Sequence, residues 1–533
     1  MNNTNILEKK LSAVIDQRNL LIPSVWVPYI EKDKLESELQ ILSNSNLGQN
    51  STSIIASGKD KRLTQCIVEM LSSAKSTAIL CSFLLADESV ENAINDAAER
   101  GVRIYLMLAC ETRLDDDNPD DDFGKMCLNQ HKSMLKRLAG KVMIRSASHY
   151  HAKAVLIDAI GPDQSQAKGL LLTANLTSEA LERNEELAVF LSRSEIKGIA
   201  DVFKWALFEN AEHQMLDNTN FQSVQPLGEV EHPSYSDSVL STTSETNSIR
   251  DHALKLINEA TSQLIISSFG WQEDHQITDA ICEKAKEGVN VVILTRIRPK
   301  SMGTLMKLKS AGAKIFGFKW LHAKAIWNDA NDAMVMSANL EQHGLDTGFE
   351  IGVKLTDNRS SNLKDCLLNF LNKRYSELLL NTMLGKLKGP VKVWDDGNFK
   401  DIEIHERITK SLEPIVASCA SGLEGQPKFP RSNWLDLPAQ EIEYQWSVKA
   451  PSLPKGAKEL FWEENLFFEN KKPDKQGKRE RKNKIIKHPY SPKVYTTANA
   501  DQVIAITQAD EIQAAIKLRN KTFSGANIVM LKV

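Results

Sequence analysis

The sequence lacks several features that would place it in a specialised class of protein. Its 533 residues include only seven cysteines, which are far apart and form no CxxC pair. This spacing argues against both a disulfide framework and a zinc ribbon. No apolar run approaches the ~20 residues that span a bilayer, and the N-terminus lacks the layout of a signal peptide. We therefore expect a cytoplasmic protein without a transmembrane anchor.

The chain also lacks a strong excess of charge of either sign. The formal net charge is -3, and the charged and hydrophobic fractions of 25% and 42% are those of ordinary globular proteins. Any contact with nucleic acid must therefore depend on local positive charge. A chain of 533 residues is too long for one small core, so two or three domains are expected.

What the sequence does contain is an internal repeat. Segment 76–108 aligns with segment 261–295, and each reads as a buried strand, an amphipathic helix and a second buried strand. A further helix and further strands follow in the same order in both copies. This alternation predicts an α/β fold, with a mixed, mostly parallel sheet flanked by helices in each half.

The repeat suggests how the chain is divided. Two repeats are separated by a polar linker that is rich in Ser and Thr, and a C-terminal accessory domain of unknown fold follows them. The expected parts are an N-terminal extension (1–54), repeat 1 (55–215), the linker (216–248), repeat 2 (249–384) and the accessory domain (385–533).

Each repeat carries a histidine, a lysine and an aspartate at the same spacing, within SHYHAKAVLID and WLHAKAIWND. The two triplets are His151, Lys153 and Asp158, and His322, Lys324 and Asp329. Residues two apart on a strand share a face, so each His and Lys should project together. A lone histidine beside a strand is more often structural than catalytic. Chance, however, predicts on the order of 0.05 such triplets in this chain, so two copies indicate a functional site.

Further polar residues follow each triplet in the same order, with seven extra residues between Asp158 and Thr173 in the first repeat. The strand ends TAN and SAN bring a hydroxyl and an amide in each repeat, and a glutamate stands eleven residues after each amide. These residues are Thr173, Asn175 and Glu186, and Ser337, Asn339 and Glu350. Together with the His and Lys pairs they could supply the nucleophile, the proton donor and the cations that cleavage of a phosphodiester requires.

This pattern resembles the phospholipase D superfamily, whose signature is a duplicated His-x-Lys-x4-Asp followed by a Gly-Ser-x-Asn-like strand. Leu172 and Met336 stand where the family usually has Gly, and Thr173 replaces the usual Ser. The resemblance implies a phosphodiesterase that needs no metal or cofactor and forms a phosphohistidine. It implies that His151 attacks phosphorus and that His322 transfers the protons, with the order of the two histidines open to exchange.

The resemblance also implies roles for the other residues. Two lysines and two asparagines would bind the nonbridging oxygens, and two hydroxyl groups would donate to the substrate. These are Lys153, Lys324, Asn175 and Asn339, and then Thr173 and Ser337. A glutamate of each half would orient the histidine of the other, Glu186 holding His322 and Glu350 holding His151. The aspartate of each motif should be structural, because it points to the opposite face of the strand.

The substrate class is open, since the superfamily includes nucleases as well as phospholipases and phosphatidyltransferases. The TANL and SANL forms resemble the nuclease branch. Segment 471–488 holds nine Lys or Arg against two acids, enough to contact a phosphate backbone, although a solvated loop explains it equally well. We therefore expect a nuclease, with DNA favoured over RNA, ahead of a soluble phospholipase. Resemblance to soluble bacterial relatives suggests a helicase or ATPase partner in defence or DNA processing.

Three other features have two interpretations each. The aromatic residues Trp271, Phe316, Phe318 and Trp320 could stack on bases, but packing in the core is favoured. The acidic run LDDDNPDDDFG (114–124) is either a solvated loop or a regulatory flap. The apolar segment LLIPSVWVPYI (20–30) is either interfacial or packed on its domain.

Overall fold

The computed structural model describes residues 53–404 with short gaps, together with Lys9–Lys10, Leu21–Pro28 and several strands between residues 416 and 532. The gaps lie at residues 59, 111–121, 162, 218–219, 234–236, 384–385, 388 and 396. The chain divides into two compact units. One is Pro28–Leu378, which contains both copies of the repeat, and the other consists of Met1–Val27 and Leu379–Val533.

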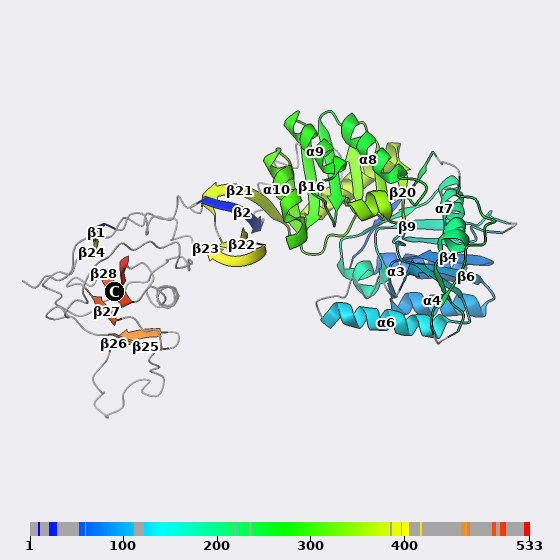
Figure 1. The fold of residues 1–533 in the computed structure, drawn as a ribbon, viewed down its shortest axis with the longest axis horizontal. Helices are drawn as coiled ribbons and strands as arrows, with labels where there is room; N and C mark the ends of the chain where they lie inside the picture. The colour runs from blue at the N-terminus through cyan, green and yellow to red at the C-terminus, as the bar shows by residue number, and fades with distance from the viewer. Residues whose placement is uncertain are drawn as a thin grey trace, which may run out of the picture. The chain divides into compact units, whose positions relative to one another are not determined.

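The first half of the larger unit is built on a mixed sheet (Figure 1). Its strands follow the order β13-β12-β7-β6-β4-β8-β9-β11-β3, and β4, β6 and β7 run parallel to one another. The strands are β3 (Ile54–Ala56), β4 (Thr77–Cys81), β6 (Arg103–Ala109), β7 (Met143–Ala147), β8 (Ala154–Ile157), β9 (Lys168–Leu172), β11 (Leu187–Phe190), β12 (His213–Met215) and β13 (Gln222–Ser223). A separate short parallel pair consists of β5 (Leu85–Ala86) and β10 (Leu176–Thr177).

Two helices of the first half, α4 and α7, begin at clear sequence signals. The Asp87 side chain accepts from the Val90 N–H at the start of α4, and Ser192 and Glu195 form a capping box on α7. The helices are α3 (Arg62–Ser73), α4 (Glu88–Glu99), α6 (Asp122–Leu138) and α7 (Arg193–Trp205), with the π-helical turns η2 (Glu179–Arg183) and η3 (Ala206–Asn210).

The second half repeats this plan. Its strands follow the order β14-β20-β19-β18-β15-β16-β17-β21, and β15, β16 and β17 are parallel. They are β14 (Val239–Thr242), β15 (Gln263–Ser268), β16 (Asn290–Arg296), β17 (Lys314–Phe318), β18 (Ala325–Asn328), β19 (Ala333–Met336), β20 (Glu350–Leu355) and β21 (Ser376–Met383). β14 lies within residues 216–248, so the segment expected to be a linker contributes a buried strand to this sheet.

Helices cover the second sheet as they cover the first. They are α8 (Ser248–Glu259), α9 (Gln276–Lys286), α10 (Met302–Ser310) and α11 (Asp357–Asn369), with the short turns η4 (Pro299–Ser301), η5 (His343–Thr347) and η6 (Phe370–Asn372). Figure 1 shows α8, α9 and α10 beside β16, and α3, α4 and α6 beside the strands of the first half. No helix in the described part of the chain is long and apolar enough to cross a lipid bilayer.

One continuous apolar core joins the two halves. It contains residues of both sheets, such as Ile79 and Val292, together with the apolar faces of α7 and α11. Alternate residues of the first sheet, such as Leu80 and Leu106, instead face a second core under α3, α4 and α6. Strand residues divide between the two cores because successive side chains point to opposite faces. The shared core fixes the two halves relative to each other.

The smaller unit contains an antiparallel sheet in which β22 (Gly389–Asp395) pairs with both β2 (Leu21–Pro28) and β23 (Asn398–Ile404). Ile22, Val25 and Trp26 of β2 are buried, so the apolar segment near the N-terminus packs as a strand. The other strands of this unit are β1 (Lys9–Lys10), β24 (Val416–Ala417), β25 (Leu460–Glu463), β26 (Leu466–Glu469), β27 (Lys493–Thr496), β28 (Gln502–Thr507) and β29 (Asn527–Lys532). Most of residues 385–533, expected to form an accessory domain, lie outside the described residues.

Candidate active site

The two His-x-Lys motifs lie in extended segments that precede strands rather than within strands. β8 and β18 each begin one residue after the motif lysine. The expectation that a strand carries these side chains is therefore wrong. The histidine and lysine of each motif are nevertheless in contact. Lys153 Nζ lies 3.0 Å from His151 Nε2, and Lys324 Nζ lies 3.2 Å from His322 Nε2.

These extended segments pair with the other half of the unit. The His151 N–H donates to the Phe349 carbonyl at 2.9 Å, and the His322 N–H donates to the Glu185 carbonyl at 2.9 Å. Phe349 and Glu185 directly precede the two glutamates of the expected site. Backbone pairing therefore determines which glutamate meets which histidine.

Each histidine is hydrogen-bonded to a glutamate of the other half. Nδ1 of His151 lies 2.6 Å from Glu350 Oε1, and Nδ1 of His322 lies 2.7 Å from Glu186 Oε1. A carboxylate only accepts, so Nδ1 carries the proton and Nε2 of the neutral ring keeps its lone pair. Both crossed pairs that the resemblance implies are present in the structure.

The hydroxyl groups of Thr173 and Ser337 contact the glutamates, not the substrate side of the site. Thr173 Oγ1 donates to Glu186 Oε2 at 2.7 Å, and Ser337 Oγ donates to Glu350 Oε2. Both residues are fully buried. The expectation that these hydroxyls donate to the substrate is therefore corrected. Each one instead fixes the second oxygen of a carboxylate whose first oxygen orients a histidine.

Lys153 and Lys324 are fully buried next to the histidines. Each ammonium group donates to the carbonyl of the histidine in its own motif, at 2.8 and 2.7 Å. Burial lowers the pKa of Lys153 to about 7 and of Lys324 to about 8, although Glu350 and Glu186 oppose the shift. The positive charge of the site therefore changes near neutral pH.

Burial also lowers the pKa of both histidines, to about 3 for His151 and about 4 for His322. The partner glutamates oppose this shift, whereas the lysines of both halves add to it. Burial alone would raise the pKa of Glu186 and Glu350, but the neighbouring histidines and lysines lower it overall. At neutral pH the site thus holds neutral imidazoles beside ionised carboxylates.

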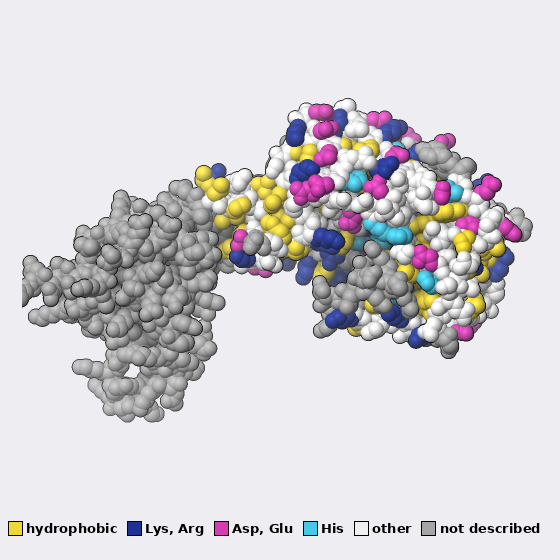
Figure 2. Space-filling view, in the orientation of Figure 1, with side chains coloured by type: hydrophobic (Ala, Val, Ile, Leu, Met, Phe, Trp, Pro, Cys, Tyr) yellow, Lys and Arg dark blue, Asp and Glu magenta, His cyan; other side chains and the backbone are white. Residues whose placement is uncertain are grey.

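The two histidines open onto one cleft of about 880 Å³ that residues of both halves line. Figure 2 shows histidine side chains gathered between the halves, with Lys and Arg side chains close by. The walls carry amide, carboxylate and cationic groups and three aromatic rings, from Phe83, Phe269 and Trp271. No Val, Leu, Ile or Met side chain lines the cleft within the described residues. The cleft therefore suits a polar, charged ligand.

Asn175 and Asn339 line the cleft as well. The Oδ1 atom of each is buried and has no hydrogen-bond partner among the described residues. Asn339 Nδ2 donates to Glu341 Oε1 at 3.0 Å, whereas the equivalent position of the first half is Thr177. The two walls of the cleft thus differ in charge, although the motif residues are duplicated.

The motif aspartates anchor the strands away from the cleft. Asp158 accepts hydrogen bonds from the backbone N–H groups of residues 75–77, and Asp329 accepts from those of residues 261 and 262. Both aspartates follow the last residue of their strand, β8 or β18. Their structural position therefore comes from the strand end and not from the opposite face of a strand.

Several cleft residues were not identified from the sequence. Phe83 lies edge-on to His151 with ring centroids 5.3 Å apart, and Phe269 lies edge-on to His322 at 4.7 Å. The signal was available, because both phenylalanines follow a serine at aligned positions of the repeat. Arg298 also lines the cleft. It was missed because the first repeat has no basic residue at the matching position.

The aromatic residues expected near the second motif are mostly buried. Trp271, Phe316 and Phe318 have exposed fractions of 4%, 7% and 1%, as core packing predicts. Trp320 is only half-buried. The acidic run 114–124 and the basic run 471–488 lie mostly or wholly outside the described residues, and their interpretations stay predictions.

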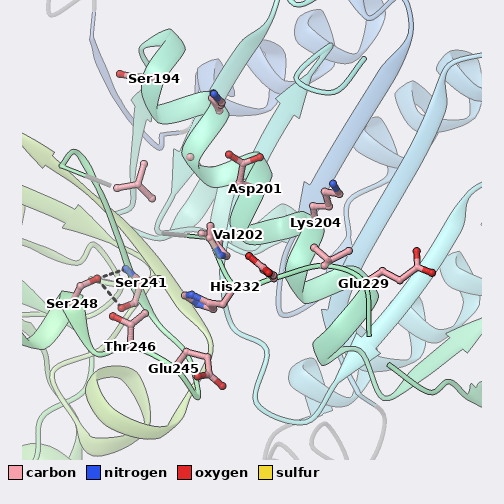
Figure 3. A pocket seen from close by; sticks show the side chains of 16 residues that line it. Ser194, Asp201, Val202, Lys204, Glu229, His232, Ser241, Glu245, Thr246 and Ser248 are labelled. Atoms are coloured by element: carbon pink, nitrogen blue, oxygen red, sulfur yellow. Dashed lines mark hydrogen bonds between the residues drawn. The ribbon is translucent and has the colours of Figure 1, made fainter. Parts of the chain in front are cut away.

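A second cavity, of about 830 Å³, lies between α7 and the segment leading into α8 (Figure 3). Asp201 and Lys204 of α7 line it together with His232 and Glu245, so both signs of charge are present. None of the expected site residues lines this cavity. Elsewhere in the described chain, too, no three or more His, Cys, Asp or Glu side chains are arranged to hold a metal ion.

Comparison with known proteins places this geometry in context. Residues 67–206 and 253–368 match the family described as "Cardiolipin synthase, PLD-like domain", where PLD stands for phospholipase D. The DISARM protein DrmC of Bacillus paralicheniformis is 26% identical over 137 residues. That match covers 24% of this chain and 57% of the relative, so the chain spans little more than half of that protein.

Two solved structures are also similar to this chain. The phosphatidylserine synthase of Haemophilus influenzae Rd KW20 is 12% identical with a TM-score of 0.46, covering 70% of this chain and 92% of that one. A phospholipase D family member, Nuc, of Salmonella typhimurium is 18% identical with a TM-score of 0.24, covering 26% of this chain and 97% of that one. The family match in both segments and the duplicated motif identify residues 67–206 and 253–368 as the two halves of a phospholipase D-like domain, a member of the phospholipase D superfamily.

Proposed function

We propose that the protein is a nuclease that cleaves phosphodiesters through a covalent phosphohistidine and without a metal, acting on DNA in preference to RNA. One observation carries this proposal. The crossed His–Glu hydrogen bonds bring two imidazoles, each beside a buried ammonium group, to one cleft. These groups can supply the nucleophile, the acid and the cations that phosphoryl transfer needs.

In the proposed first step, Nε2 of His151 attacks phosphorus and the bond from phosphorus to the leaving oxygen breaks. Glu350 keeps the proton on Nδ1 and stabilises the positive charge that the ring acquires. His322 gives a proton to the leaving oxygen. A bound phosphate favours the protonated form of His322, because a nearby anion raises the pKa of an imidazole.

In the second step, His322 takes a proton from a water molecule whose oxygen attacks phosphorus, and the bond to His151 breaks. Lys153 and Lys324 stabilise the negative charge on the nonbridging oxygens, and Asn175 and Asn339 donate to the same oxygens. The site then returns to its starting protonation state.

The lining of the cleft favours nucleic acid over lipid. A lipid enzyme must accommodate acyl chains next to the phosphate, and the described walls contain no aliphatic side chain apart from the methyl group of Thr304. Two cations that line the cleft, Arg298 and Lys300, suit a substrate with further phosphates. A role in defence or DNA processing agrees with the partial likeness to a DISARM protein. A helicase or ATPase partner is a further part of this proposal.

The test compares substrate classes in the presence of EDTA. The full chain is incubated with single- and double-stranded DNA, with RNA, and with vesicles of phosphatidylglycerol or phosphatidylcholine. We expect cleavage of nucleic acid only. Acid-quenched reactions on labelled DNA should leave label on the protein, and this label should be absent from His151→Ala. Release of a lipid head group without any cleavage of nucleic acid would overturn the proposal.

Two variants and a control test the assignment of the histidines. His151→Ala and His322→Ala should each abolish turnover while circular dichroism shows a folded protein. His213→Ala, in β12 and outside the cleft, is the matched control and should cleave at the wild-type rate. Wild-type turnover in either cleft variant would contradict the proposed chemistry.

A further inference from the structure

Arginine and aromatic side chains alternate in a row that extends from the cleft along the second half. Arg298 lies over the Phe269 ring, 4.0 Å from its centroid. Arg296 lies 5.4 Å from the centroid of Phe269 and 5.0 Å from that of Trp320. Arg183, from the first half, lies 4.0 Å from the centroid of Trp320. We call these three arginines and two rings the arginine track.

The track begins at the chemical site. Phe269 is the ring that lies edge-on to His322, and both Phe269 and Arg298 line the cleft. Arg296 is the last residue of β16, and Trp320 lies in the connection between β17 and β18. Arg296 is therefore held at a strand end and Arg183 at the end of η2, and Arg298 lies directly before η4, beside the place where the scissile phosphate would lie.

Stacking leaves the hydrogen-bonding edge of a guanidinium group available. A guanidinium that stacks on a ring uses its face, while its N–H donors point outward in its own plane. Among the described residues, neither Arg296 nor Arg298 forms an ion pair with a carboxylate. Planar donors that are held in place in this way suit the oxygens of a phosphate.

The track also concentrates positive charge. Burial lowers the pKa of Arg296, and the nearby charges of Arg298 and Arg183 lower it further, although Glu186 and Glu185 oppose the shift. Like charges held together in a half-buried region repel one another, and a bound polyanion relieves that repulsion. A ligand with several phosphates therefore gains more from this arrangement than a ligand with one.

Among its described residues, the first half has no equivalent track. Cys81 pairs with Met107 in the first sheet, and Ser267 pairs with Leu294 at the matching position of the second. Two residues further on, the second sheet ends in Arg296, where the first sheet has Ala109. In the sequence, the acidic run 114–124 follows Ala109 closely. Among the described residues, the alternation of arginines and aromatic rings thus lies on the side of His322.

We propose that the arginine track binds the phosphates that flank the scissile phosphate on the side of His322, so that the substrate is a single-stranded oligonucleotide. Cations interleaved with aromatic rings are characteristic of channels that bind single strands. This inference rests on the proposed nuclease function and narrows it. It predicts a polymer held asymmetrically rather than a small phosphodiester.

Binding measurements on the full chain test the proposal. The inactive His151→Asn variant is titrated with fluorescein-labelled dT12, and fluorescence anisotropy gives the dissociation constant at several salt concentrations. Adding Arg296→Ala or Arg298→Ala should weaken binding on the order of tenfold each, as expected for a charge-assisted hydrogen bond. The slope of log K against log salt should also fall by about 0.7 for each phosphate that the variant no longer binds.

Turnover provides the second measurement. In the otherwise wild-type chain, Arg298→Ala should reduce kcat/KM for dT12 by at least about fivefold more than it reduces kcat/KM for the dinucleotide TpT. Arg298→Lys keeps the charge but loses the planar fork of donors. Its kcat/KM for dT12 should lie between the values of the wild type and of Arg298→Ala. Arg103→Ala, at the exposed start of β6, is the matched control and should leave both values unchanged.

The outcomes separate this inference from the proposed function. The arginine track is overturned if Arg298→Ala lowers kcat/KM equally for dT12 and TpT. It is also overturned if the arginine variants bind dT12 with a dissociation constant within twofold of the parent. Both outcomes leave the proposed nuclease activity intact. A wild-type chain that cleaves no nucleic acid overturns the proposed function. If, in addition, dT12 fails to bind the His151→Asn variant, the track is overturned too.

Discussion

His151 and His322 are held neutral by burial, while Lys153 and Lys324 stay close to their midpoints at neutral pH. This division gives the empty site a nucleophile with a free lone pair and cations with a proton. The same burial makes each proton sensitive to its neighbours, so the observed titrations belong to the coupled group rather than to single residues.

The pH dependence of kcat/KM follows from these shifts. The lysines have folded-state pKa values of about 7 and 8, so the ammonium form is present below this range and is lost as the pH rises through it. Protonation of His151 near pH 3 removes the nucleophile. We expect a bell-shaped profile with its basic limb between about pH 7 and 8. A profile that stays flat up to pH 10 would rule out a role for the lysine charge.

Substitution of a crossed glutamate tests the orientation of the histidine. Glu350→Gln keeps the shape but replaces the carboxylate that holds the His151 Nδ1 proton. We expect kcat to fall by about 10²- to 10⁴-fold, with a smaller change in KM, because the wrong tautomer or ring orientation affects the reacting state. Glu245→Gln, which lines the second cavity, serves as the control. Steady-state kinetics that show an unchanged kcat would contradict the assignment.

Sequence reasoning at the residue scale succeeded where chemistry was duplicated. The His, Lys, Asn and Glu residues appear twice in the same order, and the structure brings them together at or directly beneath one cleft. Thr173 and Ser337 were assigned to the substrate side, because a sequence does not show that a hydroxyl donates to the other oxygen of a buried carboxylate. Arg296 and Arg298 were missed because they occur in one repeat only.

Among the structural elements, the extended segments before β8 and β18 are the ones that build the site. In each segment the histidine N–H donates to the carbonyl of the residue before the glutamate of the other half. The sequence predicted strands at both places but not where they begin, since the pairing partner lies in the other repeat. The ends of the same strands are fixed by Asp158 and Asp329, which bind the turns before β4 and β15.

Removal of one such anchor should destabilise the element more than it disturbs the chemistry. In Asp329→Ala the backbone N–H groups of Thr261 and Ser262 lose their acceptor. We expect the free energy of unfolding to fall by about 2–3 kcal/mol, the cost of losing hydrogen bonds to a charged group. Chemical denaturation measures this, with the exposed Asp96→Ala of α4 as the control. An unchanged unfolding midpoint would show that the turn needs no anchor.

On the scale of the whole molecule, the internal repeat made the larger unit predictable, because two copies of a pattern confirm each other. The two sheets with parallel centres follow from alternating strands and helices. The smaller unit could not be predicted in the same way. β2 pairs with β22, although the larger unit separates the two strands in the sequence. No local sequence pattern reveals such a distant partner.

The whole molecule should lose stability in acid. Burial lowers the pKa of His131 and His252 from 6.5 to about 4, besides the two site histidines. The unfolded chain therefore binds protons as the pH falls below about 6.5, before the folded chain does, and the free energy of unfolding decreases from pH 6.5 to 4.

His131→Asn tests this contribution away from the cleft. His131 is 1% exposed, and its ring accepts a hydrogen bond from the Leu85 N–H. Removing this titrating group should reduce the slope of unfolding free energy against pH by up to about 1.4 kcal/mol per pH unit. Equal slopes for the parent and the variant would refute the expected proton linkage.

The crossed glutamates have a consequence for how the protein is made. During synthesis the first half leaves the ribosome with its imidazole still unbraced, because Glu350 has not yet been translated. A prematurely terminated chain, or one cut by a protease between the halves, carries a complete motif and yet lacks the carboxylate that orients its ring. Because each half orients the histidine of the other, we expect catalysis to begin only after both halves have been synthesised and have folded together.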